Sequence, residues 1–223
     1  MSKKLYFQAL MKFILGLISV GTLLFVPAGT IEYWQGWLFI GVLFVPMFIV
    51  GIVLAIKNPY LLRKRLDSKE KEEEQKSVVV VSGFMFVAMF VTAGFNIRFE
   101  WWVLPDWVVI AAMAVFSLGY LLYAEVMREN IWLSRTIEVQ DKQQVVDSGL
   151  YRIVRHPMYA ATLLLFLTIP LILASLWSFI IMLLYLPILV RRIRNEEKVL
   201  EQHLEGYKEY MQRVRWKLIP LVW

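Results

Sequence analysis

Long apolar runs separated by charged segments dominate the chain. Four of these runs, at about residues 10–28, 36–56, 78–97 and 107–127, approach the roughly 20 residues with which a helix crosses a hydrocarbon core of about 30 Å. A fifth apolar stretch, residues 158–190, is too long for one untilted span. The pattern predicts an all-α fold, a polytopic transmembrane helix bundle.

The charges between the runs predict an orientation. The segment before the first run and the segments 57–76 and 128–155 are rich in Lys and Arg, whereas the segments around Glu32 and at 98–106 hold one basic residue between them. By the positive-inside rule, the N-terminus and the two basic segments are cytoplasmic. We therefore expect a multi-pass integral membrane protein, in a prokaryotic cell membrane rather than the endoplasmic reticulum.

The fifth stretch, residues 158–190, has basic residues on both flanks, with Arg155 before it and Arg191 after it. A single crossing would place one flank on the wrong side of the bilayer. A helical hairpin that turns near residues 174–178 keeps both flanks cytoplasmic. Each arm would have about 14–16 residues, or roughly 21–24 Å, so its length leaves open whether the hairpin crosses fully. The sequence thus predicts six hydrophobic segments with both termini cytoplasmic.

The runs divide the chain into two parts. Residues 1–128 hold the first four spans and a cytoplasmic connector at 57–77, and residues 129–223 hold the hairpin and the candidate catalytic region. The connector mixes basic and acidic residues, which predicts a solvated helix with i, i+4 pairs such as Lys69 and Glu73.

Composition narrows the possible chemistry. The chain has no cysteine, which excludes a thiolate nucleophile and a disulfide. Its net charge of +6 lies at the edges of apolar runs, where anionic lipid head groups explain it, so we expect no nucleic-acid partner. Its two histidines, His156 and His203, have no spacing that offers three metal ligands, so we expect no metal.

A polar cluster precedes the predicted hairpin. Residues 149–159 read GLYRIVRHPMY and place Tyr151, His156 and Tyr159 where idle polar groups would be costly. Pro157 favours an extended backbone at His156 and is suited to the first position of a helix. The N-terminus of that helix can bind a carboxylate or a phosphate. Simple anchoring of the helix at the lipid head groups is the alternative.

A second polar cluster follows the hairpin. Residues 191–210 include Arg192, Glu196 and Glu197, and a closed hairpin brings them beside the first cluster. Arg192 and Glu196 are four residues apart, so they share a helix face and could form a composite site for a zwitterion. A solvated face is the alternative, and the pairing of two clusters by one short hairpin favours a functional site.

With these paired clusters, the chain resembles the isoprenylcysteine carboxyl methyltransferase family, together with integral membrane methyltransferases and phospholipid N-methyltransferases of the same superfamily. The resemblance covers about the last 90 residues, and the first four spans match in hydropathy alone. The matching residues are Val145 and Val146, GLY at 149–151, RHPMY at 155–159, EE at 196–197, Leu200, Tyr207, Tyr210 and IP at 219–220.

The resemblance implies that residues 129–223 bind S-adenosylmethionine. It implies that His156 and Tyr159 hold the methionine part of the cofactor, that Glu196 engages its cationic end and that Arg192 faces the methyl acceptor. Arg192 and Glu196 are thus the expected catalytic residues. The other expected cofactor contacts are Gln143, Gln144, Val145, Val146, Tyr151, Pro157, Met158 and Glu197.

The function implied is methyl transfer to a lipophilic acceptor that enters from the bilayer, either a prenylcysteine-like carboxylate or a lipid head group. A carboxylate is already ionised, and Arg192 can orient it. A lipid amine must lose a proton, for which Glu196, Glu197 and His156 are the candidate bases. The oligomeric state is left open.

The sequence leaves two other functions as alternatives. Steroid-type reductases that use NADPH also carry an Arg-His-Pro-x-Tyr element, but they usually continue RHPNY with Phe-Gly-Glu, whereas this chain reads RHPMYAAT. A non-catalytic lipid-binding membrane protein is the other alternative, since ionisable residues are scarce within the first four spans. In that case, replacing His156 or Glu196 would leave ligand binding unchanged.

Overall fold

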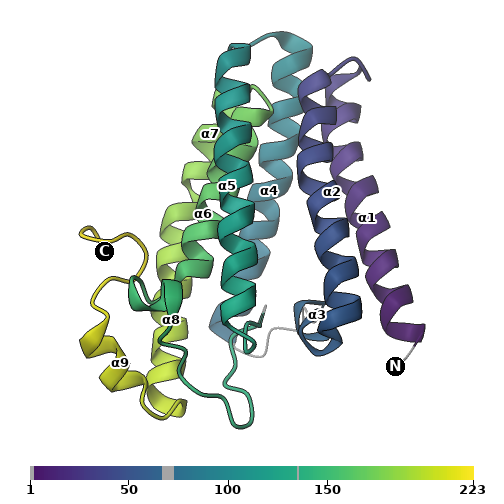
Figure 1. Ribbon diagram of the computed structural model, residues 1–223. Helices are drawn as coiled ribbons and strands as arrows, with labels where there is room; N and C mark the ends of the chain where they lie inside the picture. The colour runs from purple at the N-terminus through teal and green to yellow at the C-terminus, as the bar shows by residue number, and fades with distance from the viewer. Residues whose placement is uncertain (1–2, 67–72, 135) are drawn as a thin grey trace.

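The chain forms a bundle of long helices that carries short helices at one end (Figure 1). The structure, a computed structural model, describes residues 3–66, 73–134 and 136–223, and these are helical with turns and one isolated β-bridge. Lys69, expected to pair with Glu73, lies outside them. The all-α prediction is confirmed. The four long helices that open the chain are α1 (Lys3–Ala28), α2 (Trp34–Lys57), α4 (Glu73–Phe99) and α5 (Asp106–Glu129).

The last two hydrophobic segments form the predicted hairpin. Its first arm is α6 (Pro157–Ile172), a shorter apolar helix of 16 residues. Its second arm is α7 (Leu176–Leu183), which α8 (Tyr185–His203) continues, so that Leu176–His203 is a fifth helix long and apolar enough to cross a membrane. Among the described residues there are therefore five such helices and one shorter apolar helix, in agreement with the six segments expected.

The turn of the hairpin lies against the loop that joins α4 to α5. Val103 in that loop forms an antiparallel bridge with Ser175, and Leu104 N donates to Ala174 O at 2.9 Å. Tyr33, at the start of α2, donates its hydroxyl to Leu173 O at 2.7 Å. The hairpin thus reaches the end of the bundle at which α2 begins and α4 ends.

The outer surface of the helices is apolar. Phe84, Ile110 and Leu121 are 74%, 57% and 68% exposed, whereas Phe39 and Met89 are fully buried between the helices. Contiguous exposed apolar surface on this scale is typical of a bundle whose solvent is lipid. The chain is an integral, multi-pass membrane protein by the length and composition of its helices.

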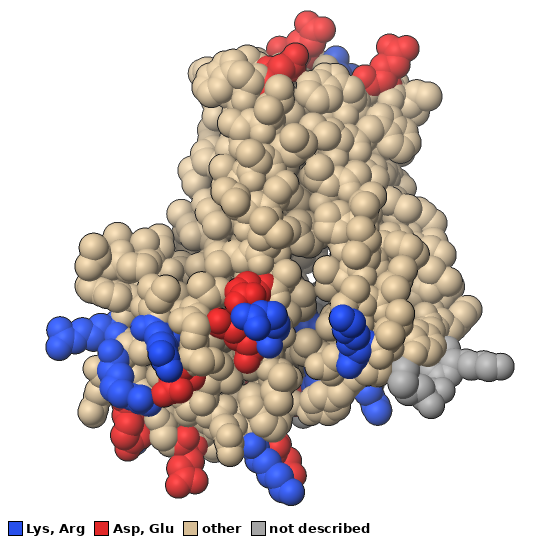
Figure 2. All heavy atoms as spheres, in the orientation of Figure 1, with Lys and Arg blue, Asp and Glu red and all other residues tan. Residues whose placement is uncertain are grey.

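Charged side chains gather at one end of the bundle (Figure 2). We call this the charged end; it carries α3 (Pro59–Leu66), η1 (Gly149–Arg152) and α9 (Tyr207–Arg213). Few charges lie at the opposite end. The described parts of the basic segments that the positive-inside rule predicts to be cytoplasmic therefore lie together at the charged end.

Helix α3 differs from the solvated connector that the sequence predicted. Leu61 and Leu62 are buried, and Leu61 packs in a cluster with Val126 and Leu133. Lys64 Nζ lies 2.8 Å from Glu138 Oε1. The prediction of a solvated face was therefore wrong for α3, because two adjacent leucines among many charges give no periodic signal although they anchor the helix.

Candidate active site

His156 lies at the junction between an extended segment and α6. Its φ is −125°, and Pro157 is the first residue of the helix, as the steric demand of proline predicted. The amides of Arg155 and His156 donate to Trp216 O and Lys217 O, each at 2.9 Å. The segment after α9 therefore holds the start of α6 in place.

Glu197 joins these segments through a buried ionic cluster. Its Oε1 lies 2.7 Å from Arg155 Nε and 3.2 Å from His156 Nε2, and its Oε2 lies 2.5 Å from Lys217 Nζ. Arg155 also donates through Nη1 to Val214 O at 2.8 Å. Because a carboxylate only accepts hydrogen bonds, His156 Nε2 donates to it, which fixes the orientation of the imidazole ring.

Tyr159 connects the two candidate catalytic residues. Arg192 Nε donates to Tyr159 Oη at 3.0 Å, and Tyr159 Oη in turn donates to Glu196 Oε2. The ring of Tyr159 packs against the His156 imidazole, with centroids 5.7 Å apart. Arg192 and Glu196 share a face of α8, as predicted, but the phenol of α6 organises them into one polar row.

Tyr151 is held from two sides at the end of η1. Its hydroxyl accepts from Asn130 Nδ2 at 2.8 Å, and its carbonyl accepts from the Tyr210 hydroxyl at 2.7 Å. Burial raises the pKa of Tyr151 above its ordinary value, so the phenol stays neutral. Glu129, at the end of α5, accepts from Leu150 N at 3.0 Å and positions the turn that carries Tyr151.

The segment after α5 forms another wall of the site. Gln143 Oε1 accepts from Gln140 N at 2.9 Å, and Gln140 Nε2 donates to Trp132 O at 2.6 Å. Tyr60 of α3 donates its hydroxyl to Gln140 Oε1 at 2.7 Å. A helix from the first half of the chain therefore supports the wall that the sequence predicted for cofactor binding.

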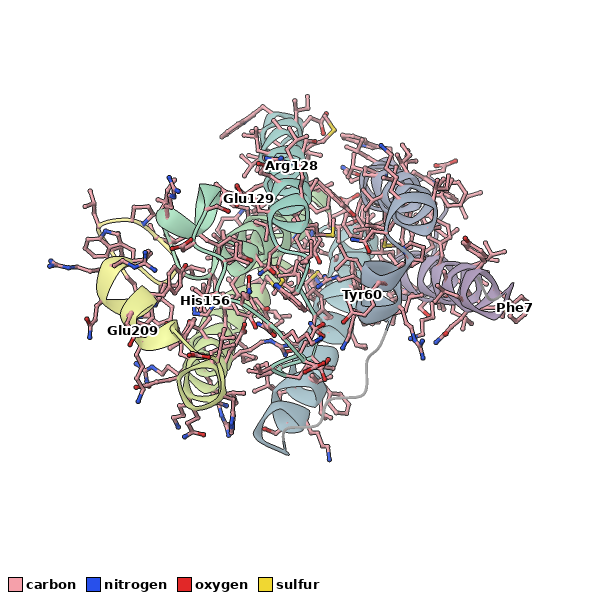
Figure 3. All side chains as sticks on the ribbon, turned by 60° about the horizontal axis from the view of Figure 1, so that its bottom comes forward. Phe7, Tyr60, Arg128, Glu129, His156 and Glu209 are labelled. Atoms are coloured by element: carbon pink, nitrogen blue, oxygen red, sulfur yellow. The ribbon has the colours of Figure 1, made fainter. Side chains whose placement is uncertain are left out.

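These elements line a pocket at the charged end. Viewed from that end, His156 lies well inside the molecule, and Tyr60 and Glu129 project from α3 and the end of α5 (Figure 3). The sequence-predicted residues that line the pocket are Gln143, Gln144, Val145, Val146, Tyr151, His156, Met158, Tyr159, Arg192 and Glu196.

Pro157 and Glu197 are not among the described lining residues. Pro157 starts α6, and Glu197 holds the ionic cluster behind His156. Several lining residues were assigned no role from the sequence. For Tyr207 and Tyr210, the YxxY spacing in the sequence was an available signal. The irregular segment that follows α5 contains no comparable signal. The unassigned lining residues are Asn130, Trp132, Leu133, Ser134, Thr136, Ile137, Glu138, Arg155, Leu200, Leu204, Tyr207 and Tyr210.

Comparison with known families gives this pocket a context. The family model described as phospholipid methyltransferase matches residues 107–206, from the start of α5 to the residue before α9. The matched segment contains both polar clusters and most of the pocket lining. Residues 107–206 are thus similar to phospholipid methyltransferases. This family stands, with isoprenylcysteine carboxyl methyltransferase, in the integral membrane methyltransferase superfamily, and the resemblance inferred from the clusters is confirmed.

A second similarity is to a sterol reductase. A stretch of 91 residues, 40% of this chain, is 32% identical to the mouse (Mus musculus) Delta(14)-sterol reductase TM7SF2. The chain covers only 22% of the length of that reductase. The similarity is therefore partial on both sides, and its support for the reductase alternative is weak.

Proposed function

We propose that the protein transfers a methyl group from S-adenosylmethionine to a lipophilic acceptor within the membrane. The observation that carries this proposal is the convergence of the two polar clusters on one pocket inside the phospholipid methyltransferase segment. His156 and Tyr159 enter it from α6, and Arg192 and Glu196 enter it from α8. The similarity to phospholipid methyltransferases suggests the type of reaction, and the pocket contains the residues to which we assign it.

The pocket residues fit a ligand that combines a cation with a zwitterionic amino acid. Glu196 offers a carboxylate to the positive groups of the ligand. His156, at the start of α6, and Arg192, on α8, line the same pocket and offer donors to a ligand carboxylate. When bound, S-adenosylmethionine supplies the transferable methyl group on its sulfonium. The chain needs no nucleophile of its own. Its residues bind, align and exclude water, which are the main requirements of such a displacement.

Two residues bear on the acceptor. Arg192 is held by Tyr159 in a position from which it can orient an acceptor carboxylate or phosphate. If the acceptor is an amine, Glu196 is the base best placed to remove its proton, since it lines the pocket while Glu197 is fully engaged behind it. The proposal therefore places acceptor chemistry on the Arg192–Tyr159–Glu196 row.

An apolar side of the pocket supports entry of the acceptor from the bilayer. Leu133 and Met158 line the pocket and also pack in the cluster of Leu61 and Val126, which partly buried Leu54 on α2 joins. On the side of Leu133 and Met158, the pocket is therefore bounded by apolar side chains. We place the charged end in the cytoplasm, from which the water-soluble cofactor enters, in accordance with its Lys and Arg content.

Similarity to a sterol reductase supports a second candidate, an NADPH-dependent reduction. The electrostatics of the pocket favour the first. Its described lining holds two glutamates, Glu138 and Glu196, and two arginines. The guanidinium of Arg155 is committed to Glu197 and Val214 O, which leaves Arg192 as the described lining arginine that could meet a phosphate. A nicotinamide cofactor with three phosphates would bring several negative charges beside these carboxylates, which is unfavourable at low dielectric.

Incubation of the purified protein with host lipid extracts and cofactor bearing a deuterated methyl group tests the proposal. Mass spectrometry of the lipids should reveal a product heavier by one labelled methyl, and a parallel incubation with prenylated peptides would identify a carboxylate acceptor. The rate at which labelled product forms should fall about tenfold or more in a Glu196→Gln variant. Hydride transfer from NADPH to a sterol, with no labelled methyl product in any extract, would instead establish the reductase.

A further inference from the structure

The side of the pocket that α8 forms is polar at one end and apolar at the other. Arg192, Glu196, Leu200 and Leu204 all line it at intervals of four residues, so they follow one face of α8 and its C-terminal residue. At 1.5 Å per residue, Glu196 and Leu204 are roughly 12 Å apart along the helix axis. The pocket is therefore elongated, and its polarity falls from the Arg192–Tyr159–Glu196 row towards α9.

One polar atom stands out at the apolar end. The hydroxyl of Tyr207 is buried and has no hydrogen-bond partner among the described residues, although the side chain lines the pocket. Tyr207 is 4% exposed and packs with Leu204, Tyr210, Val145 and other apolar side chains. A buried hydroxyl without a partner costs about 1–3 kcal/mol, so such a group in a pocket points to a ligand that satisfies it.

The state of this hydroxyl defines what it can bind. Burial raises the pKa of Tyr207 far above its ordinary value, and the negative charges of Glu197 and Glu196 raise it further. The phenol therefore keeps its proton and acts as a hydrogen-bond donor. Tyr210, its neighbour in α9, differs because its hydroxyl already donates to Tyr151 O.

We propose that Tyr207 is a cofactor-binding residue whose hydroxyl donates a hydrogen bond to the nucleoside half of the cofactor. This inference rests on the proposed function and assigns the two ends of the pocket. The amino-acid half and the sulfonium occupy the polar row, and the flat, weakly polar adenosine lies between Val145, Leu200 and Leu204. The match to the family model ends at residue 206, and Tyr207, although it is one of the residues that carry the resemblance, was assigned no role from it.

The test compares two ligands on the full-length protein in detergent. S-adenosylhomocysteine contains both halves of the cofactor, whereas 5′-methylthioadenosine contains the nucleoside half without the amino acid. Calorimetric titration of Tyr207→Phe should give a Kd raised about 3- to 10-fold for both ligands, the loss expected for one hydrogen bond. The unliganded variant should unfold at the wild-type temperature or above, since the hydroxyl satisfies nothing in the free protein.

Two control variants separate this role from a structural one. Tyr210→Phe should lower the unfolding temperature, because it leaves the buried Tyr151 carbonyl without its donor. Tyr120→Phe removes a hydroxyl that donates to Leu43 O within the bundle, away from the pocket, and should leave both Kd values unchanged. Unchanged affinities in Tyr207→Phe, or a loss for S-adenosylhomocysteine alone, would overturn the assignment. Failure of the wild-type protein to bind S-adenosylhomocysteine would instead overturn the proposed function.

Discussion

Gly149 and Glu129 meet so closely that a β-carbon at position 149 would overlap the Glu129 carboxylate. Gly149 has a φ of +48°, in the left-handed region that side chains disfavour. The same carboxylate accepts the amide of Leu150 at 3.0 Å. The glycine of the GLY triplet thus lets the end of α5 cap the turn that carries Tyr151.

Gly149→Ala should therefore destabilise the protein by about 2–4 kcal/mol, the sum of a left-handed alanine and a steric overlap, and it should weaken S-adenosylhomocysteine binding. Thermal unfolding in detergent and calorimetry measure the two effects. Gly41→Ala is the matched control, because a β-carbon there meets nothing within 4 Å, and it should not lower the unfolding temperature. Equal stability of the two variants would refute the packing argument.

The adjacent glutamates have separable roles. Glu197→Gln leaves the buried Arg155 and the partly buried Lys217 without their counter-charge, which should cost about 3–5 kcal/mol of folding free energy. Glu196→Gln should cost much less stability but weaken S-adenosylhomocysteine binding about tenfold or more, since Glu196 lines the pocket. Chemical or thermal unfolding beside calorimetry distinguishes them. The reverse pattern would assign the cofactor contact to Glu197.

Tyr159→Phe should reduce the rate of methyl transfer more than it reduces cofactor affinity. The hydroxyl joins Arg192 to Glu196, and a displacement of about 1 Å in such groups can lower the rate about 100-fold. Steady-state kinetics with the identified acceptor give kcat and KM separately. In Tyr6→Phe, a surface hydroxyl that donates to Ala55 O is lost, and kinetics should stay at the wild-type values.

Helix α3 should influence cofactor binding although it lies outside the family match. Lys64→Glu places two like charges at the contact with Glu138, on the wall that contains Gln143, and should raise the Kd for S-adenosylhomocysteine about 3-fold. The charge swap Lys64→Glu with Glu138→Lys should recover most of the loss. Arg63→Glu, an exposed change of equal charge on the same helix, serves as the control. If the swap recovers nothing, α3 does not act through this pair.

The sequence predicted the spans and the hairpin because the length of each apolar run and the charges on its flanks can be read along the chain, without knowledge of tertiary contacts. Residues 158–190 could form only a hairpin if both flanks lie on one side, and the turn at Ser175 lies within the predicted range. The paired clusters were predictable for the same reason. Tyr159 lies near the start of α6, and Arg192 and Glu196 lie four residues apart on α8, so closure of the hairpin can bring the three side chains into contact, as the structure shows.

Other parts of the site depend on tertiary contacts that leave no periodic trace. Asn130 follows the last residue of α5, where a polar residue commonly ends a helix, and its contact with the Tyr151 hydroxyl is set by the fold. Leu61 anchors α3 from within a charged segment. Glu196 lines the pocket, whereas Glu197 lies in the ionic cluster behind His156. Which of the two glutamates faces the pocket depends on the rotation of α8 about its axis, and the sequence does not show that rotation.

Calorimetric titration of the purified wild-type protein with S-adenosylhomocysteine, beside one with NADPH, tests the central claim most directly. The account predicts saturable binding of S-adenosylhomocysteine at one site per chain and at least tenfold weaker binding in Glu196→Gln, with no heat from NADPH. Binding of NADPH by the folded protein, with none of S-adenosylhomocysteine, would contradict it.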